Sequence, residues 1–562
     1  RKTLELNTLQ RLVISVTGHS TALFRTPYGR GLGPLTAAEA LPFVALDQRG
    51  YLVVGANVVP PDWQDVAPAD IVAAALAQLA PSGGNVIVLH DAGGDRSATV
   101  AALPTLIKAL REKGFRFVSL AQMLGVPREA LMPTETGARV TLDAYSFSVV
   151  GAIGTVLRGI FWLAIVLGGV RSTLILILAL TRRHYPIEGR PYTPSVTVVI
   201  PAYNEEGVIV RSIEAVLASD YPDLRLIVVD DGSNDHTCAL AEAAFANDPR
   251  IEIIREANMG KWMALDTAYS RIKTEVVVSI DADTIILPDA IRKLVRAFRD
   301  PAVGAVAGKV QVGNRGTLLT KLQALEYTIA QNIDRRAAEV FNGILVVPGA
   351  IGAWRAAAVR KAGLYTNETL AEDADLTVSV LRAGYRVVYE EAAISITEAP
   401  ETLRSFMKQR LRWTFGMMQT GWKHRRAARE GRPVGLISIP DLWLFGVVMA
   451  LLAPIADLVF LSVVVDALIN FILGQPLLKA PTSTLILAGY LALPAMEVLT
   501  ALVAFAFERK LPVLVLLIPV QRLFYRQLLY ITVYRAVWRA LTGKLAEWGK
   551  LVRLGTVRLP GP

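Results

Sequence analysis

Four long apolar stretches constrain the fold of this chain more than any other feature of its sequence. Ile160–Leu180 has about the 20 residues that a helix needs to cross a bilayer, and its one charged residue is Arg171. Three further stretches follow near the carboxyl end, at Leu442–Val465, Leu485–Phe507 and Leu511–Tyr534. A buried core helix is the alternative for such a stretch, but four of them predict a membrane protein.

Several polar residues interrupt the later stretches. Asp457 and Asp466 lie within or beside the first of them, and Gln521, Arg522 and Arg526 lie within the last. Charges are costly inside a bilayer, so we expect these side chains to face protein or a water-filled path.

The segment from about 195 to 395 alternates strand-like and helix-like patterns. The strand-like runs are almost continuously apolar, which is typical of parallel strands covered by helices on both faces. Ligands bind such sheets beyond the carboxyl ends of the strands. The predicted strands are Val196–Ile200, Arg225–Val229, Ile251–Ile254, Val276–Ile280 and Val303–Ala307.

Residues 1–135 have the pattern of a separate soluble α/β piece. Apolar runs at Asn85–Leu89 and Phe115–Leu120 alternate with helical patterns at Asp70–Leu79 and Val100–Lys113. The chain begins with arginine rather than methionine, and we expect a truncated sequence.

The net charge of +10 points to lipid rather than to nucleic acid. Lys and Arg flank the apolar stretches, and few aromatic residues accompany them, so anionic lipid and cytoplasmic loops explain the charge better than a nucleic-acid surface. The single cysteine, Cys238, excludes an internal disulfide and fits a reducing compartment.

Acidic residues cluster where predicted strands end. Asp281 and Asp283 follow one strand and share one side of an extended turn. Carboxylate pairs of this kind suit Mg²⁺ or Mn²⁺, which would neutralise a departing nucleotide diphosphate. An isolated Asp-x-Asp is more often a solvated turn, but here a buried strand precedes it and other clusters accompany it.

Three other motifs each have a structural and a functional interpretation. Asp230 and Asp231 form a turn or accept hydrogen bonds from a base or ribose. Lys261 opens a helix, where it is solvated or holds an anion. Glu372 and Asp373 cap a helix, or one of them is the general base that deprotonates an attacking sugar hydroxyl.

A helical segment before the membrane region carries Gln409, Arg412 and Trp413 on one face. Arg can hold a pyrophosphate, and Trp offers a flat surface on which a sugar ring stacks. The alternative is an Arg/Trp helix at the bilayer surface.

Together these motifs resemble those of family 2 processive glycosyltransferases from about Val196 to Trp413. The order Asp-Asp-Gly, Asp-x-Asp, Glu-Asp and Gln-x-x-Arg-Trp is shared with cellulose, chitin and hyaluronan synthases and, most closely, with bacterial poly-N-acetylglucosamine synthases. The resemblance implies a GT-A fold, a UDP-sugar donor (UDP-N-acetylglucosamine is favoured), inversion at the anomeric carbon, and passage of the polysaccharide through the enzyme's own membrane helices.

The resemblance also implies roles for single residues. Asp373, beside Glu372, would be the general base, and Ala371 departs from the Thr that relatives often carry. The metal would bind Asp283 together with Asp281, which also contacts the nucleotide. The remaining nucleotide-sugar ligands would be Tyr203, Glu205, Asp230, Asp231, Lys261, Gln409 and Arg412, and Trp413 would bind the acceptor.

The N-terminal piece resembles the second half of a carbohydrate esterase family 4 polysaccharide deacetylase, a partial α/β barrel. Arg25 and Tyr28 match its Arg-x-Pro-Tyr loop, Asp62 its Asp-Trp motif and His90 its Leu-x-His motif. The Asp-Asp base pair and the His-x-x-x-His metal ligands are missing from the sequence, and Asn57 replaces a frequent Asp. We therefore expect this piece to be inactive as given.

The expected order is a deacetylase-like domain (1–135), a transmembrane segment (148–184), a glycosyltransferase domain (190–425), a transmembrane region (436–540) and a basic interfacial tail (541–562). The transferase would face the cytoplasm of a plasma or inner membrane, and the deacetylase-like domain would lie outside. Three carboxyl-terminal spans would put the basic tail outside, against the positive-inside rule, so one span is interfacial or double.

The expected partners are a UDP-sugar, a growing polysaccharide and the lipid bilayer, with no nucleic acid and an open question about an export protein. Two alternatives remain: a transferase that adds one sugar to a lipid-linked acceptor, and an inactive membrane scaffold with a transferase fold.

Overall fold

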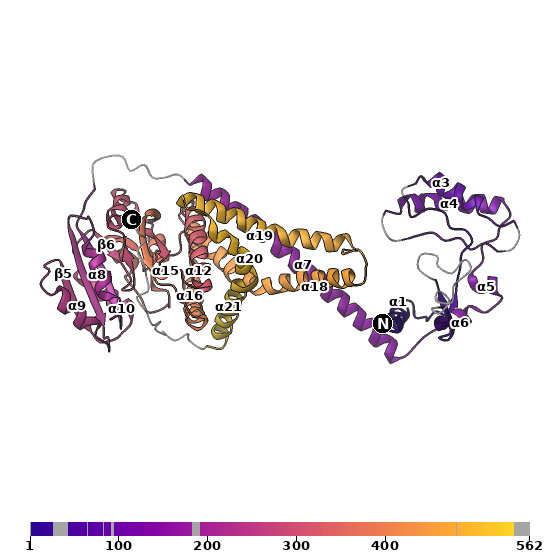
Figure 1. The fold of residues 1–562 in the computed structure, drawn as a ribbon, viewed down its shortest axis with the longest axis horizontal. Coiled ribbons are helices and arrows are strands. Elements are labelled where there is room, and N and C mark those ends of the chain that lie inside the picture. The colour runs from indigo at the N-terminus through magenta and orange to yellow at the C-terminus, as the bar shows by residue number, and fades with distance from the viewer. Residues whose placement is uncertain are drawn as a thin grey trace. The chain divides into compact units, whose positions relative to one another are not determined.

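The computed structural model describes residues 2–25, 43–64, 66–81, 84–91, 95–182, 192–478 and 480–543. Contacts divide the chain into two compact units, Arg1–Val156 and Leu157–Pro562, and each is described by itself. One helix, α7 (Ala138–Thr181), contains the boundary between the units (Figure 1).

In the first unit, two helices pack against each other to form a small core. Ile71 and Ala75 of one helix contact Leu106 and Leu110 of the other, which confirms the two predicted helices. The elements of this unit are α1 (Lys2–Thr17), β1 (Leu23–Phe24), β2 (Leu52–Val53), α3 (Pro68–Ala77), α4 (Ser97–Glu112), α5 (Leu120–Leu124) and α6 (Arg128–Leu131).

The two apolar runs of this unit contribute almost no β-structure. Within the first run, Ile87 makes a single parallel bridge to Val58. The apolar run Phe115–Leu120 forms no strand, and α5 begins at Leu120. Phe117 and Val118 are 56% and 49% exposed, so this run lacks the covering layer that would bury a strand.

The second unit is built on an eight-stranded sheet with the order β5-β4-β3-β6-β9-β8-β10-β7. Neighbouring strands from β5 to β6 are parallel, β9 runs antiparallel between β6 and β8, and β10 is parallel to β8. The strands are β3 (Val196–Ala202), β4 (Leu224–Asp231), β5 (Ile251–Glu256), β6 (Val276–Ser279), β7 (Ile285–Ile286), β8 (Val303–Val312), β9 (Gly352–Arg355) and β10 (Arg386–Thr397).

All five predicted strands are confirmed, and the mostly parallel sheet with them. The sequence analysis did not predict β7, β9 or β10. β9 has four residues, and β7 has two. In β10 the pairing with β8 shifts register between Glu390 and Ile394, which interrupts the apolar pattern.

Helices cover both faces of this sheet. Val198 and Ile200 of β3 pack on one side with α8 (Ile209–Leu217) and α11 (Ala290–Val295), whereas Val199 packs on the other. The second face is covered by α10 (Lys261–Arg271), α14 (Ala356–Ala362) and α15 (Glu372–Arg382), and α9 (Thr237–Phe245) packs against α8 and β5. Burial on both faces explains why the strands are continuously apolar.

A layer of helices lies between the sheet and the long apolar helices, as Figure 1 shows for α12 and α16. It consists of α12 (Leu318–Ile329), η3 (Ala330–Asp334), α13 (Arg335–Val340) and α16 (Leu403–Lys423). This layer connects the sheet edge to the apolar part of the chain.

Four helices of the described residues are long and apolar enough to cross a membrane, by length and composition. All four predicted stretches overlap them. They are α7, Val434–Ile472, α19 (Pro481–Glu508) and Val513–Leu541. The second of these helices comprises η5 (Val434–Ser438), α17 (Ile439–Asp441), η6 (Leu442–Val448) and α18 (Met449–Ile472). The fourth comprises η7 (Val513–Leu517), α20 (Ile518–Val520), η8 (Gln521–Tyr525) and α21 (Arg526–Leu541).

The last of these four packs on the helix α16 of this layer. Phe415 and Met418 of α16 contact Val533 and Ala536 of α21. In Figure 1, α16 and α21 run across the direction of α7, α18 and α19. This segment therefore packs on α16 as well as on α18.

The polar residues inside the apolar helices have protein partners, as expected. Arg171 donates to both carboxylate oxygens of Asp441 at 2.7 and 2.9 Å. Asp457 accepts hydrogen bonds from Tyr490 at 2.8 Å and from Gln527 at 2.6 Å. Asp466 lies near Asn470, and Glu497 forms ion pairs with Arg522 and Arg526, each at 2.8 Å.

Candidate active site

A cavity of about 840 Å³ joins the edge of the sheet to the apolar helices. One face of α7 forms part of its wall, together with the loops after β6 and before β9 and the cavity-facing side of α16. Its volume lies toward the upper end of the roughly 300–1,000 Å³ that ligand pockets occupy. Eight predicted site residues line it: Lys261, Asp281, Asp283, Glu372, Asp373, Gln409, Arg412 and Trp413.

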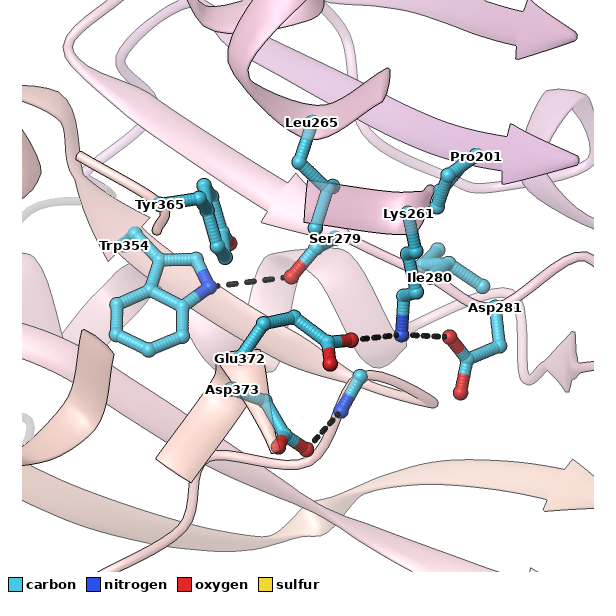
Figure 2. A pocket seen from close by; sticks show the side chains of 11 residues that line it. Pro201, Lys261, Leu265, Ser279, Ile280, Asp281, Trp354, Tyr365, Glu372 and Asp373 are labelled. Atoms are coloured by element: carbon cyan, nitrogen blue, oxygen red, sulfur yellow. Dashed lines mark hydrogen bonds and ion pairs between the residues drawn. The ribbon is translucent and has the colours of Figure 1, made fainter. Parts of the chain in front are cut away.

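Lys261 connects two of the acidic motifs. Its Nζ lies 2.7 Å from Asp281 Oδ1 and 2.9 Å from Glu372 Oε1, and Figure 2 shows the ammonium between the two carboxylates. Burial alone would lower the pKa of this ammonium, but the two carboxylates outweigh burial and raise the pKa. The ammonium therefore offsets part of the negative charge on this wall of the cavity.

Asp373 lies beside this pair without contacting the ammonium directly (Figure 2). Its carboxylate accepts hydrogen bonds from the backbone N–H groups of Ala374 at 2.8 Å and of Gly349 at 3.3 Å. Burial and, next, the charge of Glu372 raise the pKa of Asp373 to about 6, against the opposing effect of Lys261. A carboxylate with a pKa close to neutral suits a general base.

Gly349 is a site residue that the sequence analysis missed. A Cβ atom at this position would lie 2.7 Å from Lys261 Nζ and 3.0 Å from Asp281 Oδ1, so a side chain here would push against this ion pair. The pair Pro348-Gly349 is a turn signal and could have drawn attention to the loop.

Asp281 and Asp283 both line the cavity after β6. In the described ranges, no group of three or more His, Cys, Asp or Glu side chains forms a metal site. Two carboxylates fit Mg²⁺ or Mn²⁺ when the ion takes its other ligands from water and a diphosphate. The donor set is thus suited to a metal shared with substrate.

The motif at the end of β4 orders the backbone around Lys261. Asp231 accepts from the N–H groups of Met259 at 2.8 Å and Gly260 at 3.0 Å, and burial raises its pKa. Asp230 and Asp231 are 2% and 3% exposed. These two residues, and Tyr203 and Glu205 after β3, are outside the lining of the cavity, so their nucleotide-binding role stays a prediction.

Three predicted residues of α16, Gln409, Arg412 and Trp413, line the cavity. Gln409 is 6% exposed, and its Oε1 has no hydrogen-bond partner among the described residues. A buried acceptor atom of this kind is costly unless a ligand supplies a donor. The Trp413 ring lies 6.5 Å from that of Tyr327, with a tilt of 35°.

α16 is held against the start of α15. Asp375 accepts a hydrogen bond from Lys423 Nζ at 2.7 Å and lies 2.8 Å from His424 Nε2. Burial alone would raise the pKa of Asp375, but these hydrogen bonds outweigh burial and lower the pKa. A Cβ on Gly416 would lie 2.8 Å from that of Ala371. The helix that carries the Gln-x-x-Arg-Trp motif is thereby fixed relative to Asp373.

Of the four deacetylase-like residues, the first unit brings two together. His90 Nδ1 lies 2.8 Å from Asp62 Oδ1, and the His90 backbone N–H donates to Asp62 Oδ2 at 2.7 Å. Arg25 is exposed after β1, and Tyr28 lies outside the described residues. The deacetylase-like assignment stays a prediction.

Comparison with known proteins identifies the second unit. A family model described as glycosyltransferase like family 2 matches residues 194–416, from β3 to α16. An N-acetylglucosaminyltransferase of Sinorhizobium fredii is 32% identical over 49% of this chain and 67% of its own length. The chain belongs to glycosyltransferase family 2. The predicted enzyme class and the GT-A-like fold are thereby confirmed.

Two other relatives have similar names. An N-acetylglucosaminyltransferase of Rhizobium meliloti is 35% identical over 41% of this chain. A poly-beta-1,6-N-acetyl-D-glucosamine synthase of Staphylococcus aureus is 30% identical over 39% of this chain. The chain spans only 56% and 54% of the length of these two relatives, respectively.

Proposed function

We propose that this chain transfers N-acetylglucosamine from UDP-N-acetylglucosamine to the end of a growing β-linked polysaccharide, and that the product leaves along its membrane helices. The observation that carries the proposal is the single cavity that the carboxylates, the α16 motif and α7 share. The names of the three relatives support the choice of N-acetylglucosamine.

The chemistry would be one displacement at the anomeric carbon. Asp373, with its pKa near 6, takes the proton from the attacking hydroxyl of the acceptor. Asp283 and Asp281 would hold a divalent metal, which supplies charge neutralisation for the departing diphosphate. Arg412 adds a positive charge at the same cavity, and Trp413 provides a face for the acceptor sugar.

The fourth apolar segment affects the proposed topology. With α7, Val434–Ile472 and α19 as spans and Val513–Leu541 beside α16, the carboxyl end returns to the side of the transferase. UDP-sugars are cytoplasmic, so the transferase and the basic carboxyl end would both lie inside, in agreement with the positive-inside rule. The first unit would then lie on the outer side of the plasma or inner membrane.

A second function is favoured by one observation. Part of the cavity wall is apolar, with Leu167, Leu174 and Leu178 of α7 and Leu444 of η6. Such a wall also suits a lipid-linked acceptor that receives one sugar. The number of sugars added separates the two functions.

The test is incorporation of label from UDP-N-acetylglucosamine by purified protein in nanodiscs, with UDP-glucose in parallel and with Mg²⁺ or Mn²⁺. We expect high-molecular-weight product from the first donor alone, and none from Asp373→Asn. Product from UDP-glucose alone would overturn the donor. Label that partitions into organic solvent as a single-sugar lipid would establish the second function.

A further inference from the structure

A second polar cluster, outside the nucleotide residues, forms part of the cavity wall. Arg410 of α16 donates to both carboxylate oxygens of Glu326 on α12, at 3.0 and 2.5 Å. It also donates to Tyr525 Oη at 3.1 Å, and that hydroxyl donates to Glu326 in turn. The side chain of Arg410 is 8% exposed, so this guanidinium has exchanged water for fixed protein partners.

The guanidinium also contacts the ring of Trp413. Its central carbon lies 4.7 Å from the Trp413 ring centroid, and the two residues are three apart on the same helix face. Cation–π contacts of this length fix the relative orientation of the two groups. Tyr327, next to Glu326 on α12, contacts the same indole from another element.

The geometry assigns Arg410 as a positioning residue that fixes the indole plane of Trp413 and thereby the acceptor hydroxyl that Asp373 must deprotonate. This inference rests on the proposed function, because it needs an acceptor sugar on Trp413. A buried Arg–Glu pair adds little stability over apolar packing, so its better-attested value is a fixed geometry. The two partners of Arg410 come from α12 and from η8, so the apolar carboxyl-terminal segment would help to set the acceptor position.

A change in Arg410 should disturb the acceptor more than the donor. A misplacement of about 1 Å between reacting groups can cost roughly 100-fold in rate. When the acceptor hydroxyl is misplaced, water attacks the anomeric carbon instead. The bond from that carbon to the diphosphate breaks, and UDP and free N-acetylglucosamine are released. The ratio of UDP released to sugar incorporated therefore reports the proposed role, whereas a general loss of folding would lower both quantities together.

The experiment compares Arg410→Gln, Arg410→Lys and Tyr525→Phe with wild type in nanodiscs, and measures UDP release, N-acetylglucosamine incorporation, product length and UDP affinity. Arg404→Gln is the matched control, because Arg404 is exposed on the same helix. We expect Arg410→Gln to lower incorporation about ten-fold or more, to raise the ratio and to shorten the product, with UDP affinity within about two-fold. Arg410→Lys should be intermediate, since Lys keeps the charge but lacks the planar fork.

An unchanged ratio and product length in a folded Arg410→Gln protein would overturn the inference. Equal losses of UDP affinity and incorporation would also overturn it, because they would put Arg410 on the nucleotide. If Arg410→Gln does not fold, Tyr525→Phe decides, because it removes only one hydroxyl. A raised ratio of UDP released to sugar incorporated supports the positioning role of Arg410, and a wild-type ratio contradicts it. Absence of polymer from wild type would instead refute the proposed function.

Discussion

Replacing Asp373 by Asn should abolish sugar transfer and also stabilise the protein against heat. Burial raises the pKa of this carboxyl from 3.8 to about 6, so keeping it ionised at neutral pH costs roughly 3 kcal/mol of folding free energy. Asn carries no charge and escapes this cost. It has only one acceptor oxygen, so the N–H group of Ala374 or Gly349 loses a partner, at about 1 kcal/mol. The expected net gain is about 2 kcal/mol.

The sign of the pH dependence follows from the raised pKa. The cost of the charge is absent below the unfolded pKa and complete above the folded pKa near 6. The difference in unfolding temperature between Asp373→Asn and wild type should therefore be larger at about pH 8 than at about pH 5. Thermal unfolding in detergent or nanodiscs, followed by intrinsic fluorescence, measures it.

Glu372→Gln is the matched control, because Glu372 lies one residue away and is paired with Lys261 at 2.9 Å. Its substitution removes a partner from a buried ammonium and should destabilise the protein. A melting temperature of Asp373→Asn below that of wild type at about pH 8 would refute the burial argument. Transfer activity retained by Asp373→Asn would refute the base assignment.

Three further predictions concern activity. The turnover rate should be half-maximal near pH 6 and fall about ten-fold per unit below it, because the base must be deprotonated; a rate that is flat across this range would contradict the role of Asp373. Asp283→Ala should lose the dependence of UDP affinity on Mg²⁺ or Mn²⁺ in calorimetric titrations, whereas Asp289→Ala, at a partly exposed carboxylate, should keep it. Trp413→Ala should shorten the polymer more than it weakens UDP binding, and products of normal length would argue against an acceptor role.

The strands that the sequence could predict each contain an apolar run of their own. β3 is buried at every residue from Val196 to Ala202, whereas β5, at the edge of the sheet, is only partly buried but still contains the apolar run Ile253–Ile254. β9 and β10 are different, since their positions depend on pairing with β6 and β8 rather than on an apolar run of their own. Local patterns do not carry that information.

Eight of the residues that the motifs singled out line one cavity, but the motif order could not show how they contact one another. The bridge from Lys261 to Asp281 and Glu372 joins three segments, and a Cβ atom at position 349 would crowd it. The hydrogen bonds of Arg410 similarly depend on Glu326 of α12 and on Tyr525 of the last apolar segment. Each of these contacts arises from tertiary packing between residues far apart in the chain.

Arg171 illustrates why the membrane part and the transferase part form one functional structure. The sequence analysis identified it only as a charge that interrupts a span. In the structure it pairs with Asp441, lies 5.0 Å from the Phe445 ring centroid, and faces the cavity that also contains Asp373. Leu167, Leu174 and Leu178 line the same cavity at the three- and four-residue spacing of one helix face. A charge inside a span is costly unless it faces protein or a polar path. Arg171 therefore lies on the face of α7 that forms a wall of this cavity, rather than on the opposite face.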